Sequence, residues 1–400
     1  MALTGRVRLQ FTSTYHLQGK VHGPVMVPYI PLELVDLIAS FALALGDDTG
    51  PSARYWRSRL AGSLSLVCRA WHRLGQGYLW RHLKLYDGQP SLDSLTNRER
   101  LLGTVQELIL VSIDGSREMR RSVALCGREC RRLRKVILIG SGAWSAWASI
   151  GVSATVSRTV VDISFVRILH DRDWASALGK ILSSSCMTPR ATRFTLNLES
   201  APLGGAFPAL GASAVWPAVT DVVIHAQDSH TVGVVQPLLQ AVPGLFLLDR
   251  LTSLDLKVAD NLTAILSLLH HTTSLSHLSL GIDKRDMSRF ARQLSPILAA
   301  MTSLETLALR YHTGTTRVGG LRALPPSLLV DLPFTLRTVD LDLGVTGPTL
   351  DAVQAFLAQR VDEALEQWTT SATAATHVRA GHEEHAPVVW VKVGREWVQQ

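Results

Sequence analysis

The sequence has few of the features that would place the chain in a membrane or in an oxidising compartment. It contains no run of about 18 consecutive apolar residues, the length that a membrane-spanning helix needs, so we expect no membrane partner. The first 20 residues hold no continuous apolar core of signal-peptide length. Only four cysteines occur, and their spacing is not that of a disulfide scaffold. We therefore expect a cytoplasmic or nuclear protein.

Charged residues are also scarce. They make up 18% of the 400 residues, whereas 46% are hydrophobic, a balance that favours a folded chain over a disordered one. The formal net charge is +7, which is mild for this length. It permits an anionic partner without requiring one.

Motifs that would indicate catalysis or a bound cofactor are missing. In the run His382-Glu383-Glu384-His385 the histidines are three apart, not the four that put two zinc ligands on one helix face. Cys126 and Cys130 have no second pair at zinc-finger distance, which favours buried thiols. The glycine-rich run at 314–320 lacks the Gly-Lys-Ser/Thr ending of a phosphate loop. We expect no enzyme, no cofactor and no metal site.

One pattern recurs nine times: an apolar residue, two residues, an apolar residue, one residue and another apolar residue. Its first positions are separated by 24 to 32 residues, close to the period of leucine-rich repeats. The nine triplets are Val105-Leu108-Leu110, Leu133-Val136-Leu138, Val160-Ile163-Phe165, Ala191-Phe194-Leu196, Val219-Val222-Ile224, Leu251-Leu254-Leu256, Leu275-Leu278-Leu280, Leu304-Leu307-Leu309 and Leu336-Val339-Leu341. The fourth fits the pattern least well.

The pattern predicts the fold class. The last two apolar residues of a triplet are two apart, so they point to one side of a short strand. Between triplets the apolar spacing becomes helical, as at 262–269, 287–301 and 350–361. One such unit cannot bury its apolar face alone, so neighbours must stack. We predict an α/β leucine-rich-repeat solenoid over residues 86–368, with parallel strands on the concave face and helices on the convex face.

The two ends of the chain depart from the repeat. Residues 369–386 are predicted to be a polar loop, and Val388–Val393 to be a capping strand within a C-terminal segment of 369–400. At the other end, a tail of 1–27 precedes an amphipathic helix at 30–45. Helical apolar spacing resumes after a turn-rich break at 46–56 and continues to Trp80.

The helical segment resembles an F-box, in the form found in fungal F-box proteins. The matching residues are Pro31, Glu33, Leu34 and Ile38 in the first helix, then the run Ser65-Leu66-Val67-Cys68-Arg69-Ala70-Trp71, then Leu79-Trp80-Arg81-His82-Leu83. The resemblance covers residues 28–85. Two features depart from it: Ile30 stands where the family usually has leucine, and the loop at 46–56 is longer than in compact members.

The resemblance implies a role. F-box segments dock onto the Skp-type adaptor of cullin–RING ubiquitin ligases, and a following repeat domain holds a protein substrate. It implies an SCF-type substrate receptor, with an adaptor-binding surface made of Pro31, Leu34, Ile38, Leu66, Val67 and Trp71. Two alternatives remain: an interaction scaffold outside any ligase, and a repeat-protein regulator of a GTPase or nuclease.

Residues between the apolar pairs of each strand should face the concave side. In the first repeats they are largely apolar, and we expect the N-terminal segment or the F-box to cover them. In the later repeats they are polar with both charge signs, which suits a protein segment, although exposed strand positions are polar by default. The predicted substrate-binding residues are Asp255, Lys257, His277, Arg310, Asp340 and Asp342.

A basic cluster lies in the first repeat. Nucleic acid or an acidic protein could bind there, but we favour a solvated convex face and do not expect nucleic acid as a partner. The cluster consists of Arg117, Arg120, Arg121, Arg128, Arg131, Arg132, Arg134 and Lys135, offset by Glu118 and Glu129.

Overall fold

The chain forms two compact units, Met1–Gly75 and Gln76–Gln400. The computed structural model describes residues 76, 79–87, 92–149, 159–167, 174–183, 190–198, 216–226, 239–240, 242–258, 262–282, 287–311, 316–317, 333–342, 345–346, 377–382, 385–393 and 396–399. The first unit lies outside the described residues, so the predictions made for its helices and for Pro31, Leu34, Ile38, Leu66, Val67 and Trp71 fall there as well.

The second unit contains a 13-stranded sheet in which most neighbours along the sheet are also neighbours along the sequence. Every pair from β1 to β13 in it is parallel. The strands are β1 (His82–Tyr86), β2 (Glu107–Val111), β3 (Lys135–Ile139), β4 (Asp162–Val166), β5 (Arg193–Asn197), β6 (Asp221–Ala226), β7 (Ser253–Val258), β8 (His277–Ile282), β9 (Thr306–Tyr311), β11 (Thr338–Asp342), β13 (His377–His382), β14 (His385–Val393) and β15 (Glu396–Gln399). A separate parallel pair joins β10 (Thr316–Arg317) to β12 (Val345–Thr346).

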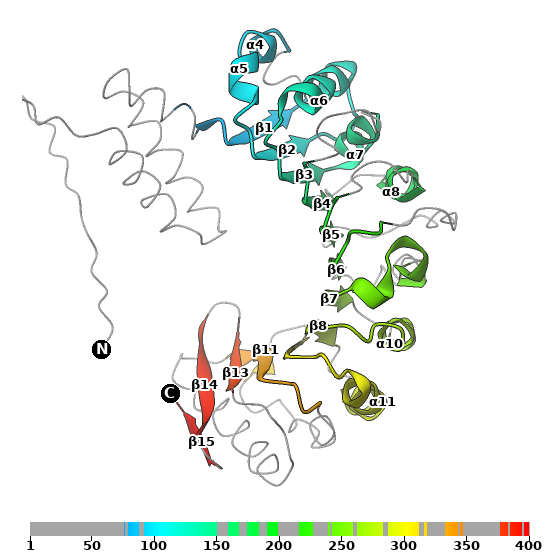
Figure 1. Ribbon diagram of the computed structural model, residues 1–400, viewed down its shortest axis with the longest axis vertical. Helices are drawn as coiled ribbons and strands as arrows, with labels where there is room; N and C mark the ends of the chain where they lie inside the picture. Colours follow the sequence, from blue (N-terminus) through cyan, green and yellow to red (C-terminus); the bar gives the residue numbers. More distant parts are fainter. Residues whose placement is uncertain are drawn as a thin grey trace, which may run out of the picture. The chain divides into compact units, whose positions relative to one another are not determined.

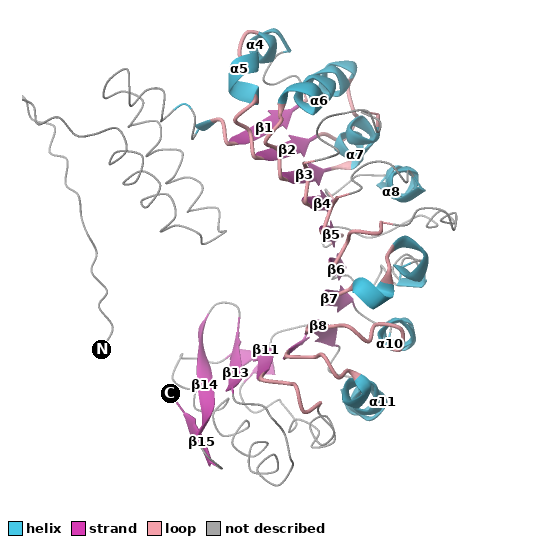
Figure 2. Cartoon of the chain, in the orientation of Figure 1, coloured by secondary structure: helices cyan, strands magenta, loops and turns pink. Residues whose placement is uncertain are grey.

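Helices connect the strands and lie along one side of them, as Figures 1 and 2 show for α6, α7, α8, α10 and α11. The described helices are α4 (Leu92–Thr96), α5 (Glu99–Leu102), α6 (Arg117–Glu129), α7 (Ser141–Ala148), α8 (Trp174–Ser183), α10 (Leu262–Leu269) and α11 (Met287–Ala300), with a 3-10 turn at Leu248–Arg250. The opposite face of the sheet, which the sequence predicts to be concave and on which none of the described helices lies, is called here the helix-free face. No described helix is both long and apolar enough to cross a membrane.

The nine predicted triplets are the core of this unit. All nine first positions and all nine second positions are buried, and so are the third positions from Leu110 to Leu309. Equivalent residues pair across the sheet, as Leu254 on β7 does with Leu278 on β8 and Leu278 with Leu307 on β9. A parallel open sheet with one helix-covered face and this repeated register is a leucine-rich-repeat solenoid, as the sequence predicts.

The sheet begins one strand earlier than the predicted start at residue 86. Trp80, Leu83 and Leu85 repeat the triplet spacing, and Leu83 and Leu85 are buried in β1 beside Leu108 and Leu110 of β2. The last residues of the F-box-like segment therefore lie in the first strand of the solenoid.

The C-terminal end differs from the predicted loop and single strand. His377–His382, placed in the polar loop by sequence, is strand β13, parallel to β11. Strand β14 then turns back antiparallel to β13, and β15 is antiparallel to β14. Pairing with β11 and β14 overrides the weak strand propensity of the run His-Val-Arg-Ala-Gly-His. The cap is thus a set of three strands, β13–β15, with antiparallel pairs at the end of the sheet, and His382 of β13 pairs with His385 of β14.

Candidate functional site

The helix-free face carries the side chains that alternate with the buried triplet residues. On β7 these are Ser253, Asp255 and Lys257, which are partly exposed, whereas Leu254 and Leu256 between them are buried. Because the strands pair in register, such residues form rows that cross the sheet from strand to strand. The rows differ in chemistry from one end of the sheet to the other.

Charged side chains from three strands meet on the later part of this face. His225 Nε2 of β6 lies 3.2 Å from Asp255 Oδ2 of β7, which makes an ion pair when the imidazole is protonated. A guanidinium nitrogen of Arg310 on β9 lies 3.9 Å from the same oxygen. We call His225, Asp255 and Arg310, with Ser279 of β8 beside them, the charged cluster.

A glycine lets Arg310 reach Asp255 across the intervening strand. In register, Lys257 of β7 pairs with Gly281 of β8, and Gly281 pairs with Arg310 of β9. Gly281 has no side chain to occupy the row, so the long Arg310 side chain can pass over β8 toward β7. The contact between Arg310 and Asp255 thus depends on β7, β8 and β9 being in the observed register.

The cluster is partly sheltered from solvent. The side chains of His225 and Asp255 are 18% and 21% exposed. Burial by itself raises the pKa of Asp255, but the neighbouring His225, Ser279 and Arg310 lower it by more, so the pKa lies below the ordinary value. Asp255 is therefore ionised at neutral pH. Its Oδ1 atom is buried and accepts no well-aligned hydrogen bond.

The lowered pKa of Asp255 predicts a pH-dependent stability. A carboxyl whose pKa is lower in the folded than in the unfolded chain stabilises the fold above its unfolded pKa of about 3.9 and loses that contribution as the pH falls through the folded value. Asp255→Asn should lower the free energy of unfolding at neutral pH by about 1–3 kcal/mol. The difference from wild type should shrink as the pH falls below about 4, because the carboxyl of the unfolded wild-type chain takes up a proton there, whereas that of the folded chain does so only at a lower pH.

Thermal unfolding of both proteins from neutral pH to about pH 3 checks this. Asp249→Asn is the matched control, because Asp249 is exposed on the turn before β7 and forms no described ion pair. A constant difference between Asp255→Asn and wild type across the whole range would show that the lost charge is not the cause.

The other predicted substrate-binding residues lie on the same face but outside the cluster. Lys257 is half-buried in the row of Arg310, and Asp340 of β11 is half-buried in the row of Asp255. His277 is exposed at the start of β8, with Nδ1 2.8 Å from Ser276 Oγ. The side chain of Asp342 is outside the described residues. His225 and Gly281 were not predicted.

A row of alternating charge crosses the first six strands. The first residues of β1 to β6 pair in the order His82, Glu107, Lys135, Asp162, Arg193 and Asp221. His82 Nδ1 lies 2.9 Å from Glu107 Oε2, and Lys135 Nζ lies 3.8 Å from Asp162 Oδ2. Burial raises the pKa of Asp162 and neighbouring Glu107 adds to it, while Lys135 and Arg193 oppose the rise. The alternation places charges of opposite sign next to each other along the row, and two of these neighbours, His82–Glu107 and Lys135–Asp162, are in contact.

Apolar side chains lie beside this row on the first repeats. Ile109 and Val111 of β2, Ile137 and Ile139 of β3, and Val166 of β4 are each half-buried. They confirm that the early part of the face is apolar. The predicted cover by the N-terminal segment or the F-box lies outside the described residues.

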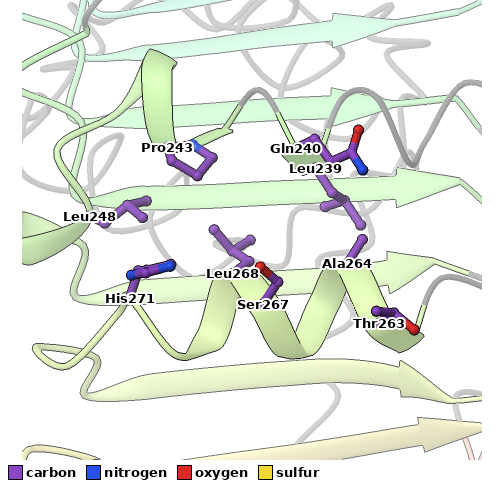
Figure 3. Close-up of a pocket in the computed structure, with 9 residues that line it drawn as sticks. All are labelled: Leu239, Gln240, Pro243, Leu248, Thr263, Ala264, Ser267, Leu268 and His271. Atoms are coloured by element: carbon purple, nitrogen blue, oxygen red, sulfur yellow. The ribbon is translucent and has the colours of Figure 1, made fainter.

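Two further features lie on the helix side. Cys126 and Cys130 are buried free thiols, as predicted; the hydrogen bond with Cys130, together with burial, raises the pKa of Cys126 well above its ordinary value, which leaves the thiol protonated. A hollow of about 460 Å³ lies between α10 and the segment at 239–248. Figure 3 shows Ala264, Ser267 and Leu268 of α10 turned toward Leu239 and Pro243 across it. Its lining is mainly apolar.

Within the described part of the chain, no group of three or more His, Cys, Asp or Glu residues could hold a metal ion. The helix-free face carries half-buried apolar side chains on β2–β4 and charged side chains on β6–β9. This combination is suited to binding another protein. The described structure therefore points to the helix-free face as a surface for association.

Comparison with known proteins does not identify a function for the helix-free face. No family model and no curated protein matches the sequence. Among solved structures, the chain is similar to the leucine-rich-repeat-containing protein LegL7 from Legionella pneumophila, with 15% identity, 76% of this chain and 92% of that chain covered, and a TM-score of 0.42. It is also similar to TLR13 in a complex with ssRNA13, with 12% identity, 70% and 40% covered, and a TM-score of 0.32. The assignment of the repeat fold rests on the strands and register of this chain.

Proposed function

We propose that the chain is a substrate receptor of an SCF-type cullin–RING ubiquitin ligase, acting in the cytoplasm or nucleus. The observation that carries the proposal is the direct succession of the two parts. The F-box-like segment ends in Leu79–Leu83, and β1 of the solenoid begins at His82. A docking segment that runs into a repeat sheet without a linker would hold a bound protein near the adaptor.

The role of such a receptor is proximity. The chain would contribute no catalytic residue, and the ligase would supply the activated ubiquitin. Binding a substrate on the solenoid raises the effective concentration of its lysines near the ubiquitin thioester. A short connection strengthens this effect, because effective concentration falls as a linker grows longer and more flexible.

The helix-free face supports the second half of the proposal. It combines half-buried apolar residues on β2–β4 with the charged cluster on β6–β9. Apolar contacts supply most of the binding free energy at protein interfaces, and charges of both signs fix the orientation and exclude wrong partners. A protein segment is the ligand that can use both.

Adaptor binding tests the first half. Replacing Leu34 and Trp71 together by alanine should abolish co-purification with the Skp-type adaptor and, through it, the cullin. If both side chains are buried at the interface, each truncation should weaken binding by about 2–5 kcal/mol. The far-ultraviolet circular dichroism of the repeat unit should not change. Adaptor binding by the double variant at the wild-type level would refute the assignment of the F-box.

Substrate capture tests the second half. Partners should be trapped with the full chain carrying Leu34→Ala and Trp71→Ala, which leaves β1 intact, and again after charge reversal at Lys257, Arg310 and Asp340. We expect the charge reversal to abolish this capture. Made in the otherwise wild-type chain, it should leave adaptor binding unchanged, because the altered residues lie on the solenoid. Unchanged capture would place the substrate site elsewhere on the chain.

A further inference from the structure

A second charged surface lies on the helix side of the first repeats, away from the helix-free face. Arg117, Arg120, Arg121 and Arg128 of α6 are all exposed, as are Arg131 and Arg132 in the turn that follows. We call these six residues the arginine ridge. Two members of the predicted basic cluster lie apart from the ridge. Lys135 is on the helix-free face and contacts Asp162, and Arg134 directly precedes β3.

The helix geometry places three of the six ridge residues on one line. At 3.6 residues per turn, residues 117, 121, 124 and 128 fall on one face of α6, which carries Arg117, Arg121 and Arg128 with Ala124 between them. The opposite face is buried through residues such as Met119, Val123 and Cys126. Glu118 and Glu129 are eleven residues apart and share a neighbouring face, so they do not interrupt the line. The ridge therefore presents cations outward along the full length of α6.

These cations are not used to stabilise the fold. No ion pair joins any ridge arginine to a described acidic residue. Arg117, Arg120 and Arg121 lie in the first five residues of α6, next to the positive end of the helix dipole. Arg117 and Arg121 are also like charges one turn apart, which repel each other. A run of cations placed where it opposes helix stability points to a ligand.

The surroundings of the ridge indicate the class of ligand. The exposed large apolar side chains of the described residues are Tyr86, Ile113, Val161, Phe334 and Val398. Ile113 is a single apolar residue in the loop before α6, and none of the five lies on α6 or in the turn after it. A protein partner normally needs a buried apolar or aromatic anchor. Single-stranded nucleic acid is normally held by base stacking on aromatic side chains. Closely and regularly spaced phosphates need neither, only cations.

We propose that the arginine ridge binds the phosphate backbone of double-stranded nucleic acid without reading its base sequence. The outward positions of α6 hold arginine, alanine and glutamate. Arginine can also pair with the edge of a guanine in the major groove, so duplexes that differ in guanine content test the absence of base readout. Arginine suits the role because its planar guanidinium can donate two hydrogen bonds to one phosphate. The inference does not depend on the ubiquitin-ligase proposal, because the ridge lies on α6 and not on the helix-free face.

The test measures binding of the full chain to a fluorescein-labelled DNA duplex of about 20 base pairs by fluorescence polarisation, between about 50 and 200 mM KCl. If the ridge makes about four to six phosphate contacts, the logarithm of the affinity should fall against the logarithm of salt with a slope of about −4 to −5. Changing the duplex sequence should not alter the dissociation constant.

The triple variant R117Q/R121Q/R128Q should raise the dissociation constant at least about tenfold and reduce the magnitude of the salt slope by about 3. It should unfold at the same temperature as wild type or higher, because the repulsion along α6 is relieved. The matched control R190Q/R250Q/R292Q removes the same charge from exposed arginines of later repeats. It should bind the duplex nearly as wild type does.

Three outcomes would overturn the inference. Equal weakening by the ridge and control variants would mean that net charge alone attracts the duplex. Tighter binding of poly-glutamate, or of phosphatidylserine vesicles, than of the duplex at equal salt would assign the ridge to an acidic protein or to a membrane. Tighter binding of a single strand of the same length would mean that bases, not paired backbones, are recognised.

Discussion

Replacing Leu278 by aspartate is expected to unfold the repeats around β8. Leu278 is 1% exposed, and its strand is paired on one side with β7 and on the other with β9. The new carboxylate would lie between Leu254 and Leu307 with no partner. Burying an unpaired charge is among the most destabilising single changes, so we expect a loss of more than about 4 kcal/mol.

Urea denaturation followed by circular dichroism measures this loss, and limited proteolysis locates it. Two other substitutions serve as controls on the same strand. Leu278→Ala removes volume without adding charge and should cost about 2–5 kcal/mol. His277→Asp adds a charge at an exposed position and should change stability by about 0.5 kcal/mol or less. Equal stability of the aspartate variants at 277 and 278 would contradict the assignment of the two faces.

Loss of β8 would also remove part of the candidate binding surface. Ser279 and Gly281 belong to the same strand, and the contact between Arg310 and Asp255 crosses it. In a solenoid each repeat contacts only its neighbours, so damage to one repeat is transmitted to those beside it. If the F-box-like segment binds the adaptor as proposed, adaptor binding should persist in the Leu278→Asp variant while substrate capture is lost.

The positions of the strands were predictable because the repeat supplies the same information many times. Each triplet by itself, such as Val160-Ile163-Phe165, could belong to any half-buried strand, but nine at one period specify a stack of strands. The prediction failed where another pattern overlapped. Trp80, Leu83 and Leu85 have the triplet spacing, yet they lie in the run that resembles an F-box, and so β1 was missed.

The charged cluster was only partly predictable, for a different reason. Asp255 and Arg310 were selected because they occupy outward positions of their strands. That they contact each other depends on the register of three strands and on Gly281 in the strand between them. His225 on β6 completes the cluster from a repeat that the predicted binding surface did not include. Repeat lengths of 24 to 32 residues do not show which outward residues share a row.

The fourth triplet fits the repeat pattern poorly but lies in a well-packed part of the core. Ala191-Phe194-Leu196 fits the repeat least well, but Phe194 is 1% exposed and lies at the centre of an aromatic group. Its ring centroid is 5.5 Å from that of Phe165, 5.5 Å from that of Trp216 and 5.2 Å from that of Phe246. Phe165 in turn contacts Trp144 of α7 at 5.9 Å. Aromatic rings here fill the volume that leucines fill in other repeats.

Phe194→Ala should therefore destabilise the solenoid and also cause its two halves to unfold separately. Removing the ring leaves a cavity among three aromatic partners, and we expect a cost of about 3–5 kcal/mol. The cavity lies at β5, between the repeats of β1–β4 and those of β6–β11. Because stability in a solenoid is a sum of repeat terms and nearest-neighbour interfaces, weakening one central interface should uncouple the two halves. The urea transition should change from a single step to two.

Intrinsic fluorescence and circular dichroism can be followed together in that titration. Trp144 and Trp216 lie on opposite sides of Phe194 along the sequence. If the halves unfold independently, the transition followed by tryptophan emission should not coincide with the transition followed by circular dichroism. Phe194→Leu keeps most of the volume and should cost about 1.5 kcal/mol or less, with one transition retained. A single coincident transition in the alanine variant, at the wild-type midpoint, would mean that the aromatic group does not couple the halves.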